Sequence, residues 1–412
     1  MNTGDTAFVL VSAALVFIMT PGLAFFYGGL GRRKNVINNM MASVFILGLG
    51  IVLWFAFGYS LSFSGNSFGV IGGLSDVFLA GQGLDAPSPY AENLPFLVFV
   101  IFQMMFALIT PAIITGAVAG RMKFKALFIF IAVWSFLVYY PLAHMVWGSG
   151  GLLGADGLGS IDFAGGNVVH ISSGVSGLVL CLLLGKRQGY EHTSYRIHNV
   201  PFVVLGMALL WFGWFGFNAG SALGANALAG HAFMTTALAT AAGLLSWMLI
   251  DVVRKRKPNL ISSCTGVVVG LVAITPGAGF VPVWAAFIIG LSAGPVCYYG
   301  IILIKQKLKI DDALDAFGCH GIGGIWGGLM TGVFADPSIN GASGLWFGNP
   351  SQFFAQIGGI LASIAIAVVG TIICVYVTKA FTELRVSRRD ELVGLDASQH
   401  GENAYPSFNG LD

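Results

Sequence analysis

Charged residues are scarce in this 412-residue chain: Asp, Glu, Lys and Arg make up 9% of it, against roughly 25% in an average soluble protein. Apolar residues make up 56%, and the formal net charge is +2. This composition excludes a soluble globular enzyme and a disordered chain. The small net charge provides no surface for nucleic acid or another polyanion. We therefore expect an integral membrane protein that contacts membrane lipid and binds no nucleic acid.

Cysteine is also rare. The five cysteines lie in or near apolar stretches: Cys181, Cys264, Cys297, Cys319 and Cys374. Their spacing fits no metal-ligand pattern, so we interpret them as small buried apolar residues and expect neither a metal nor a cofactor.

Long stretches without any charged residue mark the candidate membrane spans, each of which needs about 20 apolar residues. Nine such stretches reach 20 residues: 6–31, 35–75, 93–120, 126–155, 163–185, 197–250, 258–304, 316–335 and 337–378. Two of them are long enough for two crossings and are interrupted by turn-forming residues, at 221–230 and at 275–278. The sequence therefore predicts an all-α fold with eleven transmembrane helices.

The basic residues fall on one side of these spans. All 20 Lys and Arg residues follow an odd-numbered span. Since basic loops face the cytoplasm, the N-terminus is predicted outside and the C-terminus inside a cell (cytoplasmic) membrane. We do not expect the N-terminus to be a signal peptide, because its basic residues follow the apolar run instead of preceding it. The intervening segments are too short for a further domain, so we expect a membrane domain, 1–378, and a cytoplasmic tail, 379–412.

Two histidines lie inside spans at corresponding positions. His170 and His320 each follow an aspartate, Asp162 and Asp312, by eight residues, in spans 5 and 10. Spans that are five apart cross in opposite senses, which predicts an inverted repeat of two five-span halves plus one extra helix. Eight helical residues descend about 12 Å, so both histidines should lie near the middle of a ~30 Å apolar core.

Ionisable groups at that depth are usually functional. The alternative is two separate structural histidines, each bonded to a backbone carbonyl. We interpret Asp162 as a structural cap for the start of span 5 and not as a ligand.

Motifs along the whole chain resemble the ammonium transporter family (Amt/Mep/Rh), of the bacterial or archaeal Amt type. They are AFFYGGL (24–30), PLAHMVW (141–147), DFAGGNVVH (162–170), WFGWFGFNAGSA (211–222), DAFGCHG (315–321) and the tail segment GLDASQHGENAY (394–405). The resemblance implies eleven helices with a conducting path through each subunit of a homotrimer, and a role in nitrogen uptake. It also implies a PII-type regulatory protein that docks on the cytoplasmic face.

The resemblance further assigns roles at the outer face. It implies that Phe106, Trp147 and Ser221 recruit ammonium, and that Phe106 and Phe217 form an aromatic gate below them. Asp162 would support this outer site. The loop 148–161 is longer than expected for bacterial relatives, so the resemblance predicts the pore better than the outer vestibule.

Below the gate, the resemblance implies that His170 and His320 line an apolar path. Aromatic faces attract a small cation, and a serine hydroxyl accepts an N–H bond. A bare cation beyond the gate would lose its hydration at great cost. Ammonium should therefore be deprotonated near the gate and pass on as ammonia, although the sequence does not say whether the net species is NH₃ or NH₄⁺.

Two alternatives belong to other classes. An ammonium sensor generally needs a fused signalling domain, for which a 34-residue tail has no room. An enzyme could hold a haem or a metal on His170 and His320, with Asp311, Asp312 and Asp315 assisting. No CxxCH or HExxH motif occurs, so we do not expect an enzyme.

Overall fold

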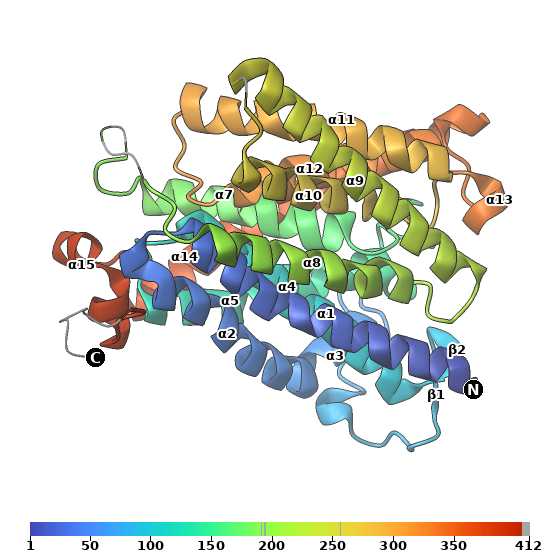
Figure 1. Cartoon of the computed structure of the whole chain (residues 1–412). Coiled ribbons are helices and arrows are strands. Elements are labelled where there is room, and N and C mark those ends of the chain that lie inside the picture. Colours follow the sequence, from blue (N-terminus) through green and yellow to red (C-terminus); the bar gives the residue numbers. More distant parts are fainter. Residues whose placement is uncertain (191, 193–194, 256, 406–412) are drawn as a thin grey trace.

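The computed structural model describes residues 1–190, 192, 195–255 and 257–405, which form a bundle of long helices (Figure 1). Within these residues, nine helical segments are long and apolar enough to cross a membrane. They are α1 (Thr3–Leu30), α2 with α3 (Val36–Leu53, Tyr59–Phe63), α4 (Phe96–Val118), α5 with α6 (Phe124–Trp134, Tyr140–Trp147), a π-helical turn with α7 (Gly166–Ile171, Ser172–Leu184), α8 (Val200–Gly220), α9 (Ala227–Lys255), α11 with the turn after it (Val283–Ile302, Leu303–Lys307) and α14 (Pro350–Phe381).

Two shorter apolar helices also belong to the bundle. They are α10 (Leu260–Ile274) and α12 (Ile322–Phe334), and the π-helical turn Phe317–Gly321 leads into α12. Outside the bundle lie α13 (Pro337–Asn340), α15 (Arg388–Val393) and an antiparallel hairpin of β1 (Pro87–Ser88) and β2 (Ala91–Pro95). The predicted helical class is confirmed, and the hairpin at 87–95 is a small addition that we did not predict.

Both predicted interruptions of the long charge-free stretches are confirmed. Helix α8 ends at Gly220 and α9 begins at Ala227. Helix α10 ends at Ile274 and α11 begins at Val283. The small residues and the two prolines in these gaps cannot continue a helix without loss of stability, so the chain turns there.

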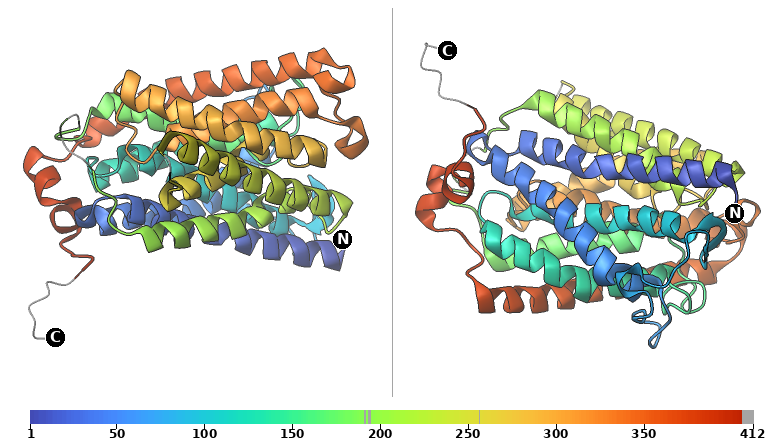
Figure 2. Two further views of the ribbon diagram at one scale, coloured as in Figure 1. Left: turned by 45° about the horizontal axis from the view of Figure 1, so that its top comes forward. Right: turned by 90° about the horizontal axis from the view of Figure 1, so that it is seen from below.

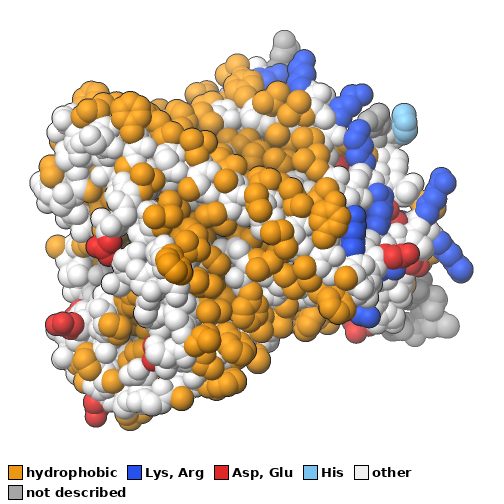
Figure 3. Space-filling view, turned by 180° about the vertical axis from the view of Figure 1, so that it is seen from behind, with side chains coloured by type: hydrophobic (Ala, Val, Ile, Leu, Met, Phe, Trp, Pro, Cys, Tyr) orange, Lys and Arg blue, Asp and Glu red, His pale blue; other side chains and the backbone are white. Residues whose placement is uncertain are grey.

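The two ends of the bundle differ in charge. The N-terminus and the β hairpin lie at one end and α15 lies at the other (Figure 1), while α14 runs along the outside of the bundle in both views of Figure 2. Apolar side chains cover the middle of the face in Figure 3, and Lys and Arg gather at one end of it. An apolar belt with one basic end is typical of a protein that crosses a membrane several times.

Close contact between α1 and α8 depends on glycine. A Cβ at Gly206 of α8 would fall on the backbone nitrogen of Phe26 in α1, because the two helices approach without an intervening side chain. Helices in membranes associate through such small residues, since lipid offers no hydrophobic force to drive them together.

We therefore predict that Gly206→Val destabilises the protein by about 1–3 kcal/mol or more, the usual cost of overpacking. Gly48→Val is the matched control, because Gly48 also lies in a helix but a Cβ there would meet nothing within 4 Å. Thermal unfolding of the two purified variants in detergent checks the prediction. Equal unfolding temperatures would show that the α1–α8 contact tolerates a larger separation.

Candidate functional site

A cavity of about 160 Å³ lies near the end of the bundle that holds the N-terminus. Its walls are mostly aromatic and contain all three residues predicted for recruitment. They are Phe63, Tyr90, Phe99, Gln103, Phe106, Trp147, Phe163, Ser221 and Leu223. We call this space the outer cavity. It is large enough for an ammonium-sized ion and a few waters, since a water occupies about 30 Å³ of liquid.

Local contacts fix the orientation of the predicted side chains in the outer cavity. The indole Nε1 of Trp147 donates to the carbonyl oxygen of Asp162 at 2.9 Å, which holds the ring against the edge of Phe106. The hydroxyl of Ser221 donates to the carbonyl oxygen of Phe217 at 2.9 Å. Because its single proton is used there, the oxygen of Ser221 is left to accept hydrogen bonds.

The loop 148–161 borders a wider hollow of about 720 Å³ that shares Phe63, Tyr90 and Trp147 with the outer cavity. Asp76 and Asp156 also line this hollow. The amide of Leu152 donates to the carbonyl oxygen of Gly69 at 2.9 Å. The loop therefore forms a wall of the approach to the outer cavity.

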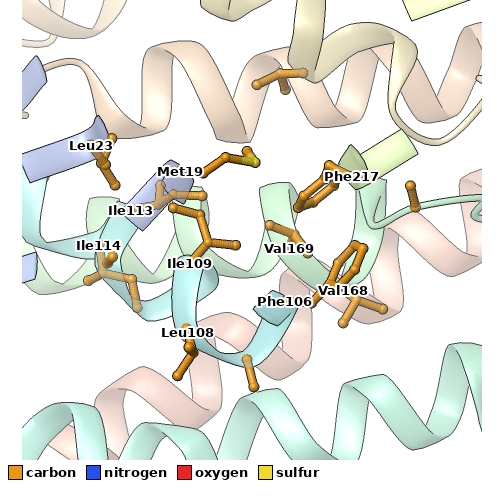
Figure 4. Close-up of a cluster of buried hydrophobic side chains, with 14 of the residues drawn as sticks. Met19, Leu23, Phe106, Leu108, Ile109, Ile113, Ile114, Val168, Val169 and Phe217 are labelled. Atoms are coloured by element: carbon orange, nitrogen blue, oxygen red, sulfur yellow. The ribbon is translucent and has the colours of Figure 1, made fainter. Parts of the chain in front are cut away.

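Two phenyl rings close the outer cavity on its inner side. The ring centroids of Phe106 and Phe217 are 4.3 Å apart, and their exposed fractions are 1% and 0%. Figure 4 shows both rings beside Val168 and Val169, with aliphatic side chains of α1 and α4 around them. At this distance the two rings are close to van der Waals contact and leave no room for a molecule between them. Any passage between the rings therefore requires them to move.

The structure brings the two predicted histidines together beyond the phenyl pair. His170 Nδ1 and His320 Nδ1 are 3.2 Å apart, and the ring of His170 lies 6.1 Å from that of Phe217. One imidazole must donate and the other accept, so at least one ring is neutral, and two charged rings at this distance would repel. The alternative of two separate histidines bonded to backbone carbonyls is wrong, because the rings bond to each other.

The spacing of aspartate and histidine has a structural cause at both positions. The carboxylate of Asp162 accepts hydrogen bonds from the amides of residues 165–168, at 2.6–3.4 Å. The carboxylate of Asp312 accepts from the amides of residues 316–318, at 2.8–3.3 Å. Each caps a π-helical turn that carries the histidine. The geometry of Asp162 is that of a cap, and its oxygens are occupied by backbone donors.

A second cavity, of about 310 Å³, approaches the histidines from the basic end of the bundle. Asp315 and Cys319 line it, and Cys319 directly precedes His320. Asp315 forms an ion pair with Lys305 at 2.8 Å, and Asp311 forms one with Arg187 at 2.6 Å. These aspartates are therefore engaged with cations of the chain itself. No group of three His, Cys, Asp or Glu side chains among the described residues is placed to hold a metal ion.

The tail packs under the basic end. Glu391 is buried, accepts from the amide of Gln188 at 2.5 Å and pairs with Arg385 at 2.8 Å. Asp396 accepts from the amide of Asn38 at 2.9 Å. Burial raises the pKa of the Asp396 carboxyl, although the surrounding backbone amides oppose this effect. These contacts connect the tail to the first turn of α2 and to the loop that follows α7.

Two residues of the site had no assigned role in the sequence. Trp214 stacks on His170 with ring centroids 5.3 Å apart and donates to Thr275 Oγ1 at 2.9 Å. Gln103 lines the outer cavity together with Phe99 and Phe106 of the same helix. Phe99, Gln103 and Phe106 are four and then three positions apart, which is the spacing of one helix face. This signal in the sequence could have placed Gln103 on the same face as the two phenylalanines.

Comparison with known proteins gives consistent results. The sequence model of the Ammonium Transporter Family matches residues 7–405. The chain is 48% identical over 408 residues to the ammonium transporter of Bacillus subtilis (strain 168), and the match covers 98% of this chain and 99% of the relative. The crystal structure of Saccharomyces cerevisiae Mep2 is 38% identical, with a TM-score of 0.91, over 99% of this chain and 93% of Mep2. A structure titled "Sensor Amt Protein" is 29% identical, with a TM-score of 0.88, over 96% of this chain and 98% of that chain.

We predict that Asp162→Asn destabilises the protein by about 1–3 kcal/mol, because the amide group would leave buried backbone donors without an acceptor. Asp156→Asn is the control, since Asp156 is exposed and, among the described residues, accepts a hydrogen bond from the amide of Gly150 alone. Thermal unfolding in detergent separates the two. If both variants unfold at the same temperature as the wild type, the cap at the start of the π-helical turn contributes nothing to stability.

Proposed function

Since the chain belongs to the ammonium transporter family, we propose that it carries ammonium or ammonia across the cytoplasmic membrane. Members of this family are transporters and not enzymes, and this chain is a multi-pass membrane protein of that kind. The observation that carries the proposal is a succession of neighbouring sites. An aromatic cavity, a phenyl pair and a histidine pair follow one another, and a second cavity lies beyond them.

Ammonium first enters the outer cavity. The faces of Trp147 and Phe106 attract a small cation by about 0.5–2 kcal/mol, and Ser221 Oγ accepts one of its N–H bonds. None of the described residues that line this cavity is positively charged. The arrangement is suited to a partly dehydrated cation that can donate hydrogen bonds.

Ammonium then loses a proton near the phenyl pair. The space around Phe106 and Phe217 is formed by hydrocarbon side chains. Moving an unpaired cation into such surroundings costs far more than moving a neutral molecule. Neutral ammonia therefore passes when the rings part.

Ammonia next meets the histidine pair. Each imidazole offers a ring nitrogen that can donate or accept according to its tautomer, and His170 Nε2 has no hydrogen-bond partner among the described residues. The pair supplies polar contacts to ammonia in an interior that is otherwise apolar. The shared Nδ1–Nδ1 bond also provides a route by which a proton could follow.

The same proposal includes the arrangement in the membrane. Nine long apolar segments together with α10 and α12 correspond to eleven crossings. The duplicated Asp-capped turns before α7 and α12 support an inverted repeat of two halves, with α14 as the extra helix. The gathering of Lys and Arg at the end that holds the tail supports a cytoplasmic C-terminus.

Assembly and regulation are part of the proposal as well. We expect a homotrimer with one path per subunit, and a membrane domain of 1–378 that acts with the tail of 379–412. The basic loops and the packed tail form the face on which a PII-type protein would dock. The basic loops would give such a partner a positively charged platform.

A sensor of the same fold is the second candidate, because one of the similar structures is a sensor. Uptake of ammonium by liposomes that contain the purified protein distinguishes the two. A transporter equilibrates ammonium much faster than empty liposomes do. Uptake no faster than in empty liposomes would favour sensing and overturn the proposal.

We predict that His170→Ala and His320→Ala each lower ammonium uptake by about tenfold or more, or remove the preference for ammonium over K⁺. The estimate corresponds to the loss of one strong hydrogen bond on the path. His192→Ala is the control, because His192 is exposed outside the bundle. Uptake and selectivity in liposomes check this, with trimer content measured in parallel. Wild-type behaviour of both single variants would remove the histidines from the path.

We also predict that Gly394→Asp lowers uptake several-fold without lowering the amount of trimer in the membrane. Gly394 has φ +119°, and a Cβ there would lie 2.6 Å from the carbonyl oxygen of Lys34, so a side chain displaces the tail from the loop. Gly401→Asp adds the same charge at a turn where a Cβ meets nothing within 4 Å. Unchanged uptake by Gly394→Asp and by a truncation after Lys379 would make the tail a passive extension.

A further inference from the structure

A further cavity, of about 630 Å³, lies where the tail meets the basic end of the bundle. Its walls come from three segments that are far apart in the sequence: the loop that follows α1, the loop that precedes α8, and the tail. It borders the second cavity of the proposed path at Ile197, which lines both. We call this space the tail cavity. Four cationic side chains line it: Arg32, Arg33, Lys34 and Arg196.

These four cations have no carboxylate partner among the described residues. The ion pairs of that part of the chain are formed by other cations, which are Arg121, Lys123, Arg187, Lys305 and Arg385. The guanidinium group of Arg32 lies 3.8 Å from the ring centre of Tyr195, and that of Arg33 lies 5.2 Å from the ring centre of Tyr405. Aromatic faces therefore position these two groups but do not neutralise them.

The unpaired charge is partly removed from water. Arg32 and Lys34 are half-buried, whereas Arg33 and Arg196 are exposed. Burial lowers the pKa of the Arg32 guanidinium, because the charged form loses hydration. An anion that entered the tail cavity would restore the lost interactions. The cluster is therefore a place where negative charge is stabilised.

One acidic residue, Asp396, also lines the tail cavity, but its carboxylate is directed into the protein. Its Oδ1 accepts from the amide of Asn38 in the first turn of α2, at 2.9 Å, and its Oδ2 is buried. Neither oxygen is therefore presented to a ligand, and the groups that a ligand meets are predominantly positive.

The tail is fixed across the cavity by a contact of Tyr405. His198 Nδ1 lies 3.2 Å from the carbonyl oxygen of Gly31, and His198 Nε2 lies 3.0 Å from the hydroxyl of Tyr405. A carbonyl oxygen only accepts, so Nδ1 donates and Nε2 of the neutral ring accepts from the tyrosine. The two loops and the tail are thus joined in the absence of a ligand, and the tail cavity is a preformed site.

We propose that the tail cavity binds a small organic anion that carries several phosphate charges, of the nucleoside polyphosphate or anionic phospholipid headgroup class. Arginine forks match phosphate oxygens in two parallel hydrogen bonds. A volume of about 630 Å³ lies in the range of sites for organic ligands. The side chains of Ile197, Val393 and Tyr405 provide apolar wall for the organic part of the ligand.

A bound anion would connect the tail to both loops, because all three segments supply lining residues. We therefore expect the ligand to stabilise the packed arrangement of the tail, in addition to the contact between His198 and Tyr405. The inference goes beyond the proposed function and does not depend on it, since binding is measured without ammonium flux.

The test uses the full chain in nanodiscs of phosphatidylcholine, a lipid without net charge. ATP is the soluble probe and dihexanoyl phosphatidic acid is the headgroup probe, each titrated by calorimetry. We expect at least one probe to bind at one site per chain. Arg33→Gln combined with Arg196→Gln should weaken that binding about tenfold or more, because charge-assisted hydrogen bonds are lost.

Arg388→Gln combined with Arg389→Gln is the matched control. It removes the same charge from two exposed arginines of α15 that do not line the tail cavity. We expect this control to bind the probe like the wild type. Binding of ATP alone would identify a soluble ligand, and binding of the phosphatidic acid alone would identify a lipid headgroup. Either result, if it depends on Arg33 and Arg196, supports the site.

Ala397→Trp keeps the proposal testable if the Arg33 and Arg196 variant fails to fold. Ala397 lines the tail cavity and is exposed, so an indole there fills the space without changing the charge. We expect it to weaken binding about tenfold or more as well. Equal binding by wild type and Ala397→Trp would overturn the proposal. Equal weakening by the two arginine pairs, or no binding of either probe to the wild type, would also overturn it.

Discussion

The cost of placing a charge in an apolar interior governs the arrangement of this molecule. Only 9% of the residues are charged, and the charged side chains that are buried lie against backbone groups or opposite charges. Arg121, which is fully buried, donates to the carbonyl oxygens of Gly185 and Asp311 at 2.8 and 2.6 Å. Asp162 and Asp312 are each surrounded by backbone amides.

The same cost explains why the path consists of different parts. A cation is stable where aromatic faces and neutral oxygens replace part of its hydration, as in the outer cavity. It is not stable beside Phe217 and the surrounding aliphatic side chains. Under the proposed function, the transported species changes its charge between these regions, and the paired imidazoles lie next to Phe217. Close helix contacts through glycines such as Gly206 let α1 and α8 pack without an intervening side chain.

Much of this could be predicted from the sequence because strong local signals exist. Charge-free runs and their interruptions located the helices, since turn-forming residues between apolar stretches leave few alternatives. The matched spacing of Asp162–His170 and Asp312–His320 predicted one shared site, because equal depth in opposite helices brings side chains together. Phe106 and Phe217 could not be found this way, as the chain has 33 Phe. Only the family resemblance singled them out.

Other features depend on tertiary contacts that no local pattern records. Gln103 is a single polar residue in an apolar run, and its position on the cavity wall follows from the packing of α4. The burial of Glu391 depends on Arg385 and on the amide of Gln188, which is 203 residues away. The strands at 87–95 are short and bounded by prolines, so their pairing gives no alternating pattern.

The central claim is that a bare cation does not pass the phenyl pair and that ammonium crosses because it can lose a proton. The most direct measurement compares ammonium and K⁺ flux into the same liposomes containing the wild-type protein, at equal concentration and ionic strength. K⁺ has a similar size but no proton to give up. The account predicts rapid ammonium entry and K⁺ entry no faster than in empty liposomes. Protein-dependent K⁺ entry at a rate comparable to that of ammonium would contradict it.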